Sequence, residues 1–411
     1  MARVLGVIAE YNPFHNGHKF HLQESIKKAE TDYTVAVISG NFVQRGNPSV
    51  VNKWQKAKMA LESGVDLVIE LPTIYSVSSA ENFAYGAIQI FNNLKIVNTV
   101  SFGTETDDLA GINNIANLLI EEPKEYGILL QEELKKGNSF PKARQIAVLK
   151  ILNDDMRYLK LLTSPNNILG IEYLKSLKRS KSTISPMIVK RENVYYNDEA
   201  VVDDFASATA IRRLIALRQY EDLRKVMPKK NYFLLMDEVQ RGNYVLDLCQ
   251  YEKEIIYNLR RMSLQDIANL PDVSEGLENS IKNAASLCNH LSELINMVKT
   301  KRYTGTRVQR ILIYCLLGIT KKDMALSKKA KPYVRVVGMN EKGKALISKI
   351  KKANPKLEII TSVKKFMDYN KDKVTRQLLD IDIRATDIYT LGYQTTSLAN
   401  MDYTNCIVIK E

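Results

Sequence analysis

The sequence predicts an α/β protein in which a parallel sheet with helices on both faces is followed by a helical domain and a small C-terminal α/β segment. Apolar runs of strand length alternate with amphipathic stretches of helical length over residues 1–225. This alternation is typical of parallel sheets with helical crossovers. Residues 226–325 show helical spacing, and strands return after residue 326. We therefore expect three parts: 1–225, 226–325 and 326–411.

The first part contains five predicted strands with helices between them. Residues 109–185 are expected to be mostly helical, and Gly64 suits the position just after a helix end. In chain order the predicted elements are strand RVLGVIA, helix KFHLQESIKKAE, strand YTVAVISG, helix NKWQKAKMALESG, strand VDLVIELP, helix SAENFAYGAIQIFNNL, strand IVNTVSFGTE, helix SPNNILGIEYLKSL, strand SPMIVKREN and helix SATAIRRLIALRQ.

The other two parts are read in the same way. The expected helices of residues 226–325 are KNYFLLMDEVQR, EKEIIYNLRRM, GLENSIKNAAS, HLSELINMVKT and RVQRILIYCLLGI. The last part contains a β-α-β unit made of PYVRVVGMN, EKGKALISKIKKAN and LEIITSV.

The composition is that of a soluble globular protein, with 45% hydrophobic and 26% charged residues. No apolar run reaches the roughly 20 residues that span a bilayer. The N-terminal MARVLGVIAEYNPF lacks the apolar region and cleavage site of a secretion signal. The four cysteines are scattered without metal-binding spacing, as expected for reduced thiols. We expect a cytoplasmic protein.

The net charge of +13 is unevenly distributed along the chain. Residues 1–225 contribute only +2, whereas residues 226–411 contribute +11. This asymmetry favours a compact site joined to a polyanion-binding surface. The alternative is a lysine-rich surface that only interacts with solvent.

Polar clusters follow the predicted strands at the points where the strands end. These clusters are EYNPFHNGH, SGNFVQRG, ELP and FGTET. Ligands of open α/β sheets bind at the carboxyl ends of the strands, near the point where the strand order reverses. The clusters should therefore meet at one edge of the sheet and form the site.

Three of the four histidines lie within residues 15–21, in a turn that runs from the first strand into a helix. His15 and His18 are three residues apart, so they lie on one side of the first helical turn. Free N–H groups at a helix start attract phosphate, and Gly17 allows a close approach. The pattern predicts a site that stabilises an α-phosphate under attack. A zinc site or a structural turn are the alternatives, with His21 expected to be a packing residue.

A second phosphate-binding pattern opens a late helix. The run SATAIR places two hydroxyl groups, Ser207 and Thr209, at the helix start and Arg212 one turn further on. Hydroxyls, free N–H groups and a guanidinium can together hold β- and γ-phosphates. The alternative is a simple helix cap with a surface arginine.

Together the two patterns resemble the HxGH nucleotidyltransferase superfamily, which also includes class I aminoacyl-tRNA synthetases. No KMSKS-type loop is present, which argues against a synthetase. The wider resemblance is to the bacterial tRNA(Met) cytidine acetate ligase family. It rests on GVIAEYNPFHNGH, SGNFVQRGNPSVVNKW, GVDLVIELP, SAENFAYGAI, SPNNILGIEYL, SATAIRR and KRYTGTRVQRILIYCLLGI.

The resemblance implies a Rossmann-like nucleotidyltransferase fold and an ATP-dependent ligase. ATP and acetate would give acetyl-adenylate and pyrophosphate, with Mg²⁺ bridging the phosphates. The acetyl group would then pass to N4 of the wobble cytidine of elongator tRNA(Met), with release of AMP. Two other classes stay open. One is a small-molecule adenylyltransferase of the pantetheine-phosphate or nicotinamide-mononucleotide type, and the other is an RNA-binding protein with an inactive nucleotide site.

The resemblance also implies which residues bind ATP, with His15 and His18 as the catalytic pair. After Arg191 the family pattern is not matched, because the sequence reads NVYYNDEA. The implied ATP-binding residues, besides Ser207, Thr209 and Arg212, are Val7, Ile8, Ala9, Glu10, Tyr11, Asn12, Pro13, Phe14, His15, Asn16, Gly17, His18, Lys19, Phe20, Gly103, Asn167 and Arg191.

The predicted tRNA-binding stretch is KTKRYTGTRVQR, at residues 299–310, where Tyr303 could stack on a base. The alternative is a solvated helix start. Arg45 could bind acetate or a tRNA phosphate, or pair with Glu70. The lysine runs of SKKAKPYVRV and SKIKK are weaker candidates, because such runs usually only solvate a face. The predicted tRNA contacts are Lys301, Arg302, Arg307 and Arg310.

Overall fold

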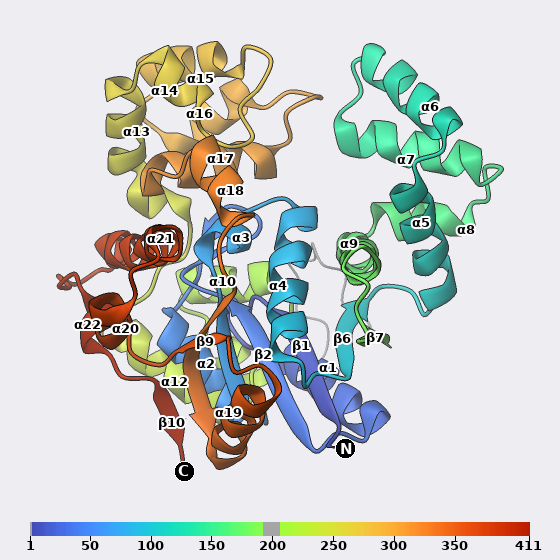
Figure 1. The fold of residues 1–411 in the computed structure, drawn as a ribbon. Helices are drawn as coiled ribbons and strands as arrows, with labels where there is room; N and C mark the ends of the chain where they lie inside the picture. Colours follow the sequence, from blue (N-terminus) through green and yellow to red (C-terminus); the bar gives the residue numbers. More distant parts are fainter. Residues whose placement is uncertain (1, 192–205) are drawn as a thin grey trace.

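The computed structural model describes residues 2–191 and 206–411 of the chain. Its centre is one sheet in the order β10-β8-β5-β2-β1-β6-β7, with β9 beside β8 (Figure 1). Those strands of this sheet that come from the first half of the chain are all parallel and agree with the predicted ones; they are β1 Val4–Ala9, β2 Tyr33–Ser39, β5 Leu67–Leu71, β6 Thr99–Thr104 and β7 Ser185–Lys190. The chain adds β2 and β5 on one side of β1, then β6 and β7 on the other. The strand order therefore reverses between β1 and β6.

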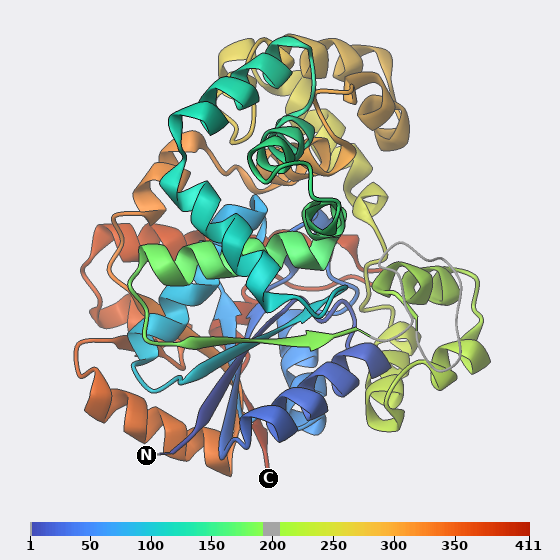
Figure 2. The same cartoon turned by 90° about the vertical axis from the view of Figure 1, so that its right-hand side faces the viewer.

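Alternate side chains of each strand enter two cores on opposite faces of the sheet. In β1, Val4 and Ile8 pack into one core, and Leu5 and Val7 pack into the other. The first core is covered by α4 Ala80–Leu94, α5 Leu109–Glu121, α9 Pro165–Arg179 and α19 Glu341–Ala353. The second is covered by α1 Asn16–Ala29, α2 Lys53–Glu62, α10 Ala208–Ala216, α11 Tyr220–Lys225 and α12 Lys229–Gln240 (Figure 2).

Two groups of helices extend beyond one edge of the sheet (Figures 1 and 2). The first is formed by α6 Lys124–Lys135, α7 Phe140–Ile151 and α8 Arg157–Thr163. The second is formed by α13 Glu252–Arg261, α14 Leu264–Ala268, α15 Leu277–Leu287, α16 Leu291–Val298, α17 Gly305–Leu317 and α18 Lys321–Ser327. The second group shares a third core with α21 Lys373–Tyr389. The helical character predicted for residues 226–325 is confirmed.

The C-terminal strands belong to the main sheet. The predicted β-α-β unit is present as β8 Tyr333–Asn340, α19 and β9 Glu358–Ile360, with β8 and β9 parallel. However, β8 also pairs with β5, and this pairing is antiparallel. The predicted fold class is confirmed, and the strands of residues 1–225 in this sheet are parallel. The sheet as a whole is mostly parallel but mixed, because the chain enters β8 from the edge where β5 ends. The boundaries proposed at residues 225 and 325 stay a prediction.

Several short elements have no counterpart in the sequence prediction. They are β3 Phe42–Val43, β4 Asn47–Pro48, α3 Thr73–Ser76, α20 Val363–Tyr369, α22 Met401–Thr404 and β10 Val408–Lys410, together with the 3₁₀ turns η1 Leu248–Tyr251 and η2 Thr390–Gly392. The long helix α21 was also not predicted.

A buried ionic network joins the C-terminal segment to the parallel strands. Lys53 Nζ lies 3.1 Å from Glu70 Oε1 and 2.8 Å from Asp402 Oδ1. Arg335 Nη1 lies 3.1 Å from Glu70 Oε2, and its Nη2 contacts Asp402. All four side chains are nearly inaccessible to solvent. Nearby, burial and then the Glu70 carboxylate raise the pKa of Asp382 to about 7.

Arg335→Met should destabilise the protein by about 3–5 kcal/mol, because it leaves Glu70 and Asp402 with one cation between two buried carboxylates. The measurement is the free energy of unfolding from urea titration. The control is Arg157→Met, the same change in the exposed Arg157–Asp155 pair, whose atoms are 2.6 Å apart. It should leave the midpoint almost unchanged. Equal losses in both variants would contradict a special role for the buried network.

Candidate active site

The turn after β1 is anchored by buried side chains. Tyr11 and Phe14 are 1% and 0% exposed and belong to the core that also holds Ala210 of α10. Both polar atoms of the Asn12 amide form hydrogen bonds with the backbone of residues 48–50. Its Oδ1 accepts from Val50 N at 2.7 Å, and its Nδ2 donates to Pro48 O at 3.3 Å. The turn therefore presents the start of α1 in a fixed position at the edge where β1 ends.

The two catalytic candidates cap the helix that carries them. Gly17 N donates to His15 Nδ1 at 3.1 Å, and His15 N donates to His18 Nδ1 at 3.3 Å. The rings lie close together, with centroids 3.8 Å apart. A neutral ring whose Nδ1 accepts a hydrogen bond carries its proton on Nε2. Both imidazoles are thus set as Nε2–H donors.

The surroundings keep these rings neutral. Burial, and then the positive charge of Arg191, lower the pKa of His15 from 6.5 to about 3. Burial, and then the adjacent His15 ring, hold the pKa of His18 well below 6.5. At neutral pH both rings are therefore uncharged and act as neutral hydrogen-bond donors.

Gly103, Arg191 and His21 meet beside these histidines. A Cβ atom added to Gly103 would lie 3.5 Å from Arg191 Cγ and 3.8 Å from His21 Cδ2. Arg191 follows β7, and its backbone N donates to Thr104 O at 2.8 Å. Three segments that are distant in sequence thus converge at the point where the strand order reverses. The loop that departs from the family pattern, residues 193–200, lies outside the described residues.

His21 lies closer to the site than its predicted packing role implied. Its Nε2 is 3.2 Å from Ser101 Oγ, which is in turn 2.7 Å from Ser25 Oγ. Burial, and then the charge of Arg191, lower the pKa of His21 to about 4. The one-turn spacing from His18 was the sequence signal, because it keeps all three rings on one side of α1.

Asn167 is fully buried and bonded to the loop after β6. Its Oδ1 accepts from Glu105 N at 3.0 Å, and its Nδ2 donates to Lys160 O at 3.4 Å. The Glu105 carboxylate accepts from the backbone N of Asn166 and of Asn167 at the start of α9. In this arrangement Asn167 shapes the loop beside Gly103, and its contact with ATP stays a prediction. Glu105 was not selected from the sequence, although the polar cluster FGTET contains it.

The second phosphate-binding pattern occupies the start of α10. Ser207 is the N-cap and accepts from Ala210 N at 3.0 Å, and Arg212 Nη2 donates to Thr209 Oγ1 at 3.2 Å. Asn16 ties α1 to this region, because its Nδ2 donates to Lys225 O at 2.9 Å and its N donates to Val226 O at 3.0 Å. Figure 2 shows this group of helices, in yellow-green, beside α1, in blue.

The β3–β4 hairpin borders the site on its other side. Gln44 N donates to Glu10 Oε1 at 2.8 Å, and Gln44 Nε2 donates to Ser78 O at 3.0 Å. Lys56, missed by the sequence reading, is fully buried; its Nζ donates to Glu10 O at 3.1 Å and to Ser39 O at 2.7 Å. Burial lowers the pKa of Lys56 to about 7. Glu70, a suggested partner of Arg45, is bound by Lys53 and Arg335 instead.

The predicted tRNA-binding residues fall into two pairs. Lys301 and Arg302 are exposed in the loop before α17. Arg307 donates to Asp272 O and Ser274 Oγ, and Arg310 Nε donates to Asp272 Oδ2 at 2.9 Å. The second pair therefore fixes a loop. Lys301 faces solvent, whereas the exposed Arg302 pairs with Glu275, its Nη2 lying 2.8 Å from Oε2. Whether any of the four contacts tRNA stays a prediction.

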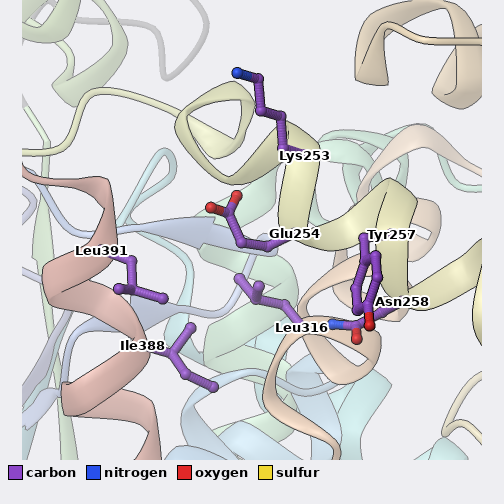
Figure 3. A pocket seen from close by; sticks show the side chains of 7 residues that line it. All are labelled: Lys253, Glu254, Tyr257, Asn258, Leu316, Ile388 and Leu391. Carbon is purple, nitrogen blue, oxygen red and sulfur yellow. The ribbon is translucent and has the colours of Figure 1, made fainter.

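A separate pocket of about 400 Å³ lies between α13, α17 and the α21–η2 junction. Figure 3 shows its lining residues, Lys253, Glu254, Tyr257, Asn258, Leu316, Ile388 and Leu391. These residues differ from all those predicted to bind ATP or tRNA.

Across the described part of the chain, no three His, Cys, Asp or Glu residues are grouped to hold a metal. No helix there is long and apolar enough to cross a membrane.

Known proteins match this chain over almost its entire length. Residues 2–403 match the HIGH Nucleotidyl Transferase family model. A Thermoanaerobacter sp. strain X514 protein named tRNA(Met) cytidine acetate ligase is 44% identical over 406 residues, 98% of this chain and 99% of the relative. A protein of the same name from Acetivibrio thermocellus is 43% identical, over 99% and 100%.

Two solved structures of Thermotoga maritima TmcAL share this fold. The apo form has a TM-score of 0.94 and 32% identity, and covers 99% of both chains. A form described as bound with alpha-thio ATP has a TM-score of 0.91 and 33% identity, again over 99% of both chains.

The buried histidines should make stability depend on pH. Unfolded His15 takes up a proton below about pH 6.5, whereas folded His15 stays neutral to about pH 3, so lowering the pH favours unfolding. When the pH falls from 6.5 to 5, the free energy of unfolding of His15→Gln should therefore decrease by about 2 kcal/mol less than that of the original protein.

Urea titrations at the two pH values measure this difference. The control is Gly17→Ala, whose added Cβ would meet His15 Cε1 at 2.9 Å and perturb the same turn without removing a titrating group. The assignment of a buried neutral ring fails if His15→Gln keeps the original pH dependence.

Proposed function

Because this chain belongs to the tRNA(Met) cytidine acetate ligase family of HIGH nucleotidyltransferases, we propose that it is an ATP-dependent ligase that acetylates a cytidine of tRNA(Met). In this proposal acetate is the acyl donor and elongator tRNA(Met) the acceptor, with N4 of the wobble cytidine as the acetylated atom. ATP is the co-substrate, in line with the relative described as bound to alpha-thio ATP.

The observation that carries the proposal is the pair of capped histidines at the start of α1. Backbone N–H groups occupy both Nδ1 atoms, which leaves two neutral Nε2–H donors beside a helix start. Negative charge on an α-phosphate is stabilised by donors that are already oriented before the reaction. The arrangement suits adenylate formation, where charge on that phosphate grows in the transition state.

In the first step an acetate oxygen attacks the α-phosphorus and the bond to the β-phosphate oxygen breaks. Pyrophosphate leaves with the bonding electrons, and acetyl-adenylate forms. We assign His15 and His18 to the α-phosphate and Ser207, Thr209 and Arg212 to the departing pyrophosphate. In the second step the cytidine amine attacks the acetyl carbon, AMP leaves, and the amine loses a proton.

Mg²⁺ would accompany the nucleotide. It usually binds substrate phosphates and waters and needs few protein ligands. This fits a site whose described residues supply hydrogen-bond donors and no group of three His, Cys, Asp or Glu. When bound, the ion shares the negative charge of the leaving pyrophosphate.

The target base must leave its stack to reach the adenylate. A wobble base already lies in a loop, so the cost of exposing it is small. Lys301 and Arg302, exposed before α17, are proposed to contact the tRNA backbone. The middle of α17 also packs on the hairpin beside the site, because a Cβ at Gly46 would lie 2.5 Å from Arg310 N.

Exchange of labelled pyrophosphate into ATP should depend on acetate. The reverse of the first step needs acetyl-adenylate, so omitting acetate should abolish the signal, and tRNA should not be required. Exchange at the same rate without acetate would refute the ligase. Exchange that instead responds to a phosphopantetheine or nicotinamide mononucleotide would favour the small-molecule adenylyltransferase.

His18→Ala should slow acetate-dependent exchange by about 10²–10³-fold, because it removes one oriented donor. Binding of tRNA, measured by filter retention, should stay unchanged. The control is His290→Ala, the same substitution at the exposed N-cap of α16. If His18→Ala retains full exchange, His18 does not act on the phosphate.

A further inference from the structure

The positive charge of the C-terminal half is concentrated in one segment. Residues 321–373 contain 16 Lys and Arg against 5 Asp and Glu, a net charge of +11. Residues 226–320 and 374–411 together are neutral, with 15 of each sign. The basic character of this half therefore comes from the stretch between α18 and the start of α21, and the predicted tRNA-binding stretch at 299–310 lies outside it.

The antiparallel strand β8 divides this segment between the two ends of the sheet. Tyr333 begins β8 close to the carboxyl end of β5, where Arg335 pairs with Glu70. The lysines that precede β8 consequently lie toward the edge that carries the ATP-site residues. The lysines of α19, which follows β8, lie toward the opposite edge.

Five exposed lysines gather at the near end: Lys328, Lys329, Lys331, Lys371 and Lys373, the lysine cluster. The first three join α18 to β8, and the last two flank the start of α21. The two segments touch, because Gln377 Nε2 donates to Asp323 Oδ1 at 2.7 Å and the charge of Lys331 acts on Asp372. Within the described residues, none of the five lysines forms an ion pair.

The one carboxylate inside the cluster is already engaged. Asp372 caps α21, and its Oδ2 accepts from Thr375 Oγ1 at 2.5 Å. Close by, Tyr369 is 57% exposed, and its hydroxyl donates to Glu358 at 3.1 Å. Because five lysines surround this single carboxylate, the cluster is a net cationic surface beside an exposed aromatic ring. Ammonium groups on flexible stems fit a phosphate backbone without reading its sequence.

The surface is close enough to the site to serve the same substrate. Three strand spacings separate β8 from β1, which is about 14 Å. We propose that the lysine cluster binds the phosphate backbone of the RNA substrate while the target base occupies the site at the end of β1. This inference rests on the proposed function for the identity of the RNA.

The test compares two triple variants that remove equal charge. Lys328→Ala/Lys329→Ala/Lys331→Ala should weaken binding of tRNA(Met) transcript and lower the slope of log affinity against log salt by about 2–3. The control triple, Lys349→Ala/Lys351→Ala/Lys352→Ala, lies on α19 at the opposite end and should keep both affinity and slope. Fluorescence anisotropy between 50 and 200 mM salt measures both, about a fourfold range in salt.

Acetate-dependent pyrophosphate exchange reports separately on the ATP site and should be unchanged in both triples. Equal losses of tRNA affinity in the two triples, or no loss in the cluster triple, would overturn the proposal. Loss of exchange in the cluster triple would also overturn it, because the lysines would then act on ATP. Exchange without acetate in the original protein would refute the ligase and leave the binding comparison readable.

Discussion

The structure depends above all on the hydrogen bonds that close the first turn of α1 with its own histidines. A helix start has unpaired N–H groups that need acceptors. In this chain His15 Nδ1 accepts one of them, and His18 Nδ1 accepts the N–H of the cap residue itself. The same two bonds set the tautomer of each ring. Capping a helix and orienting a pair of donors are thus a single interaction.

Buried charged side chains, as well as apolar packing, hold that turn in place. Lys56 draws together the carbonyl oxygens of Glu10 and Ser39, at the ends of two neighbouring strands. Lys53, one turn earlier on α2, pairs with Glu70 and Asp402 and so connects the C-terminal part of the chain to the same strands. Such buried ions gain little net free energy but penalise alternative arrangements that leave one unpaired. The site is therefore fixed by residues from both ends of the sequence.

The sequence could predict what local pattern determines. Val/Ile-rich runs mark β1, β2 and β5, and the spacing of His15, Gly17 and His18 marks a phosphate-binding turn. It could not predict the partner of β8, because an apolar run does not encode which strand lies beside it. It also could not separate Lys301, which faces solvent, from Arg310, which binds Asp272 across a loop. Nor could it predict that the buried Asn167 amide bonds to the backbone of Glu105 and Lys160, and the contact of Asn167 with ATP stays a prediction.

The antiparallel insertion of β8 has a consequence for synthesis on the ribosome. Strand β5 is entirely buried in the finished sheet, yet its outer edge pairs with a strand near the end of the chain. Until that strand emerges, the nascent protein exposes an open apolar edge, and Glu70 lacks one of its two cations, Arg335. Exposed edges invite wrong pairing. The part of the chain that carries the histidine turn is thus synthesised first, but its sheet is completed only after β8 has been synthesised. A fragment ending at residue 325 would keep the histidine turn and lose the strand that covers its sheet.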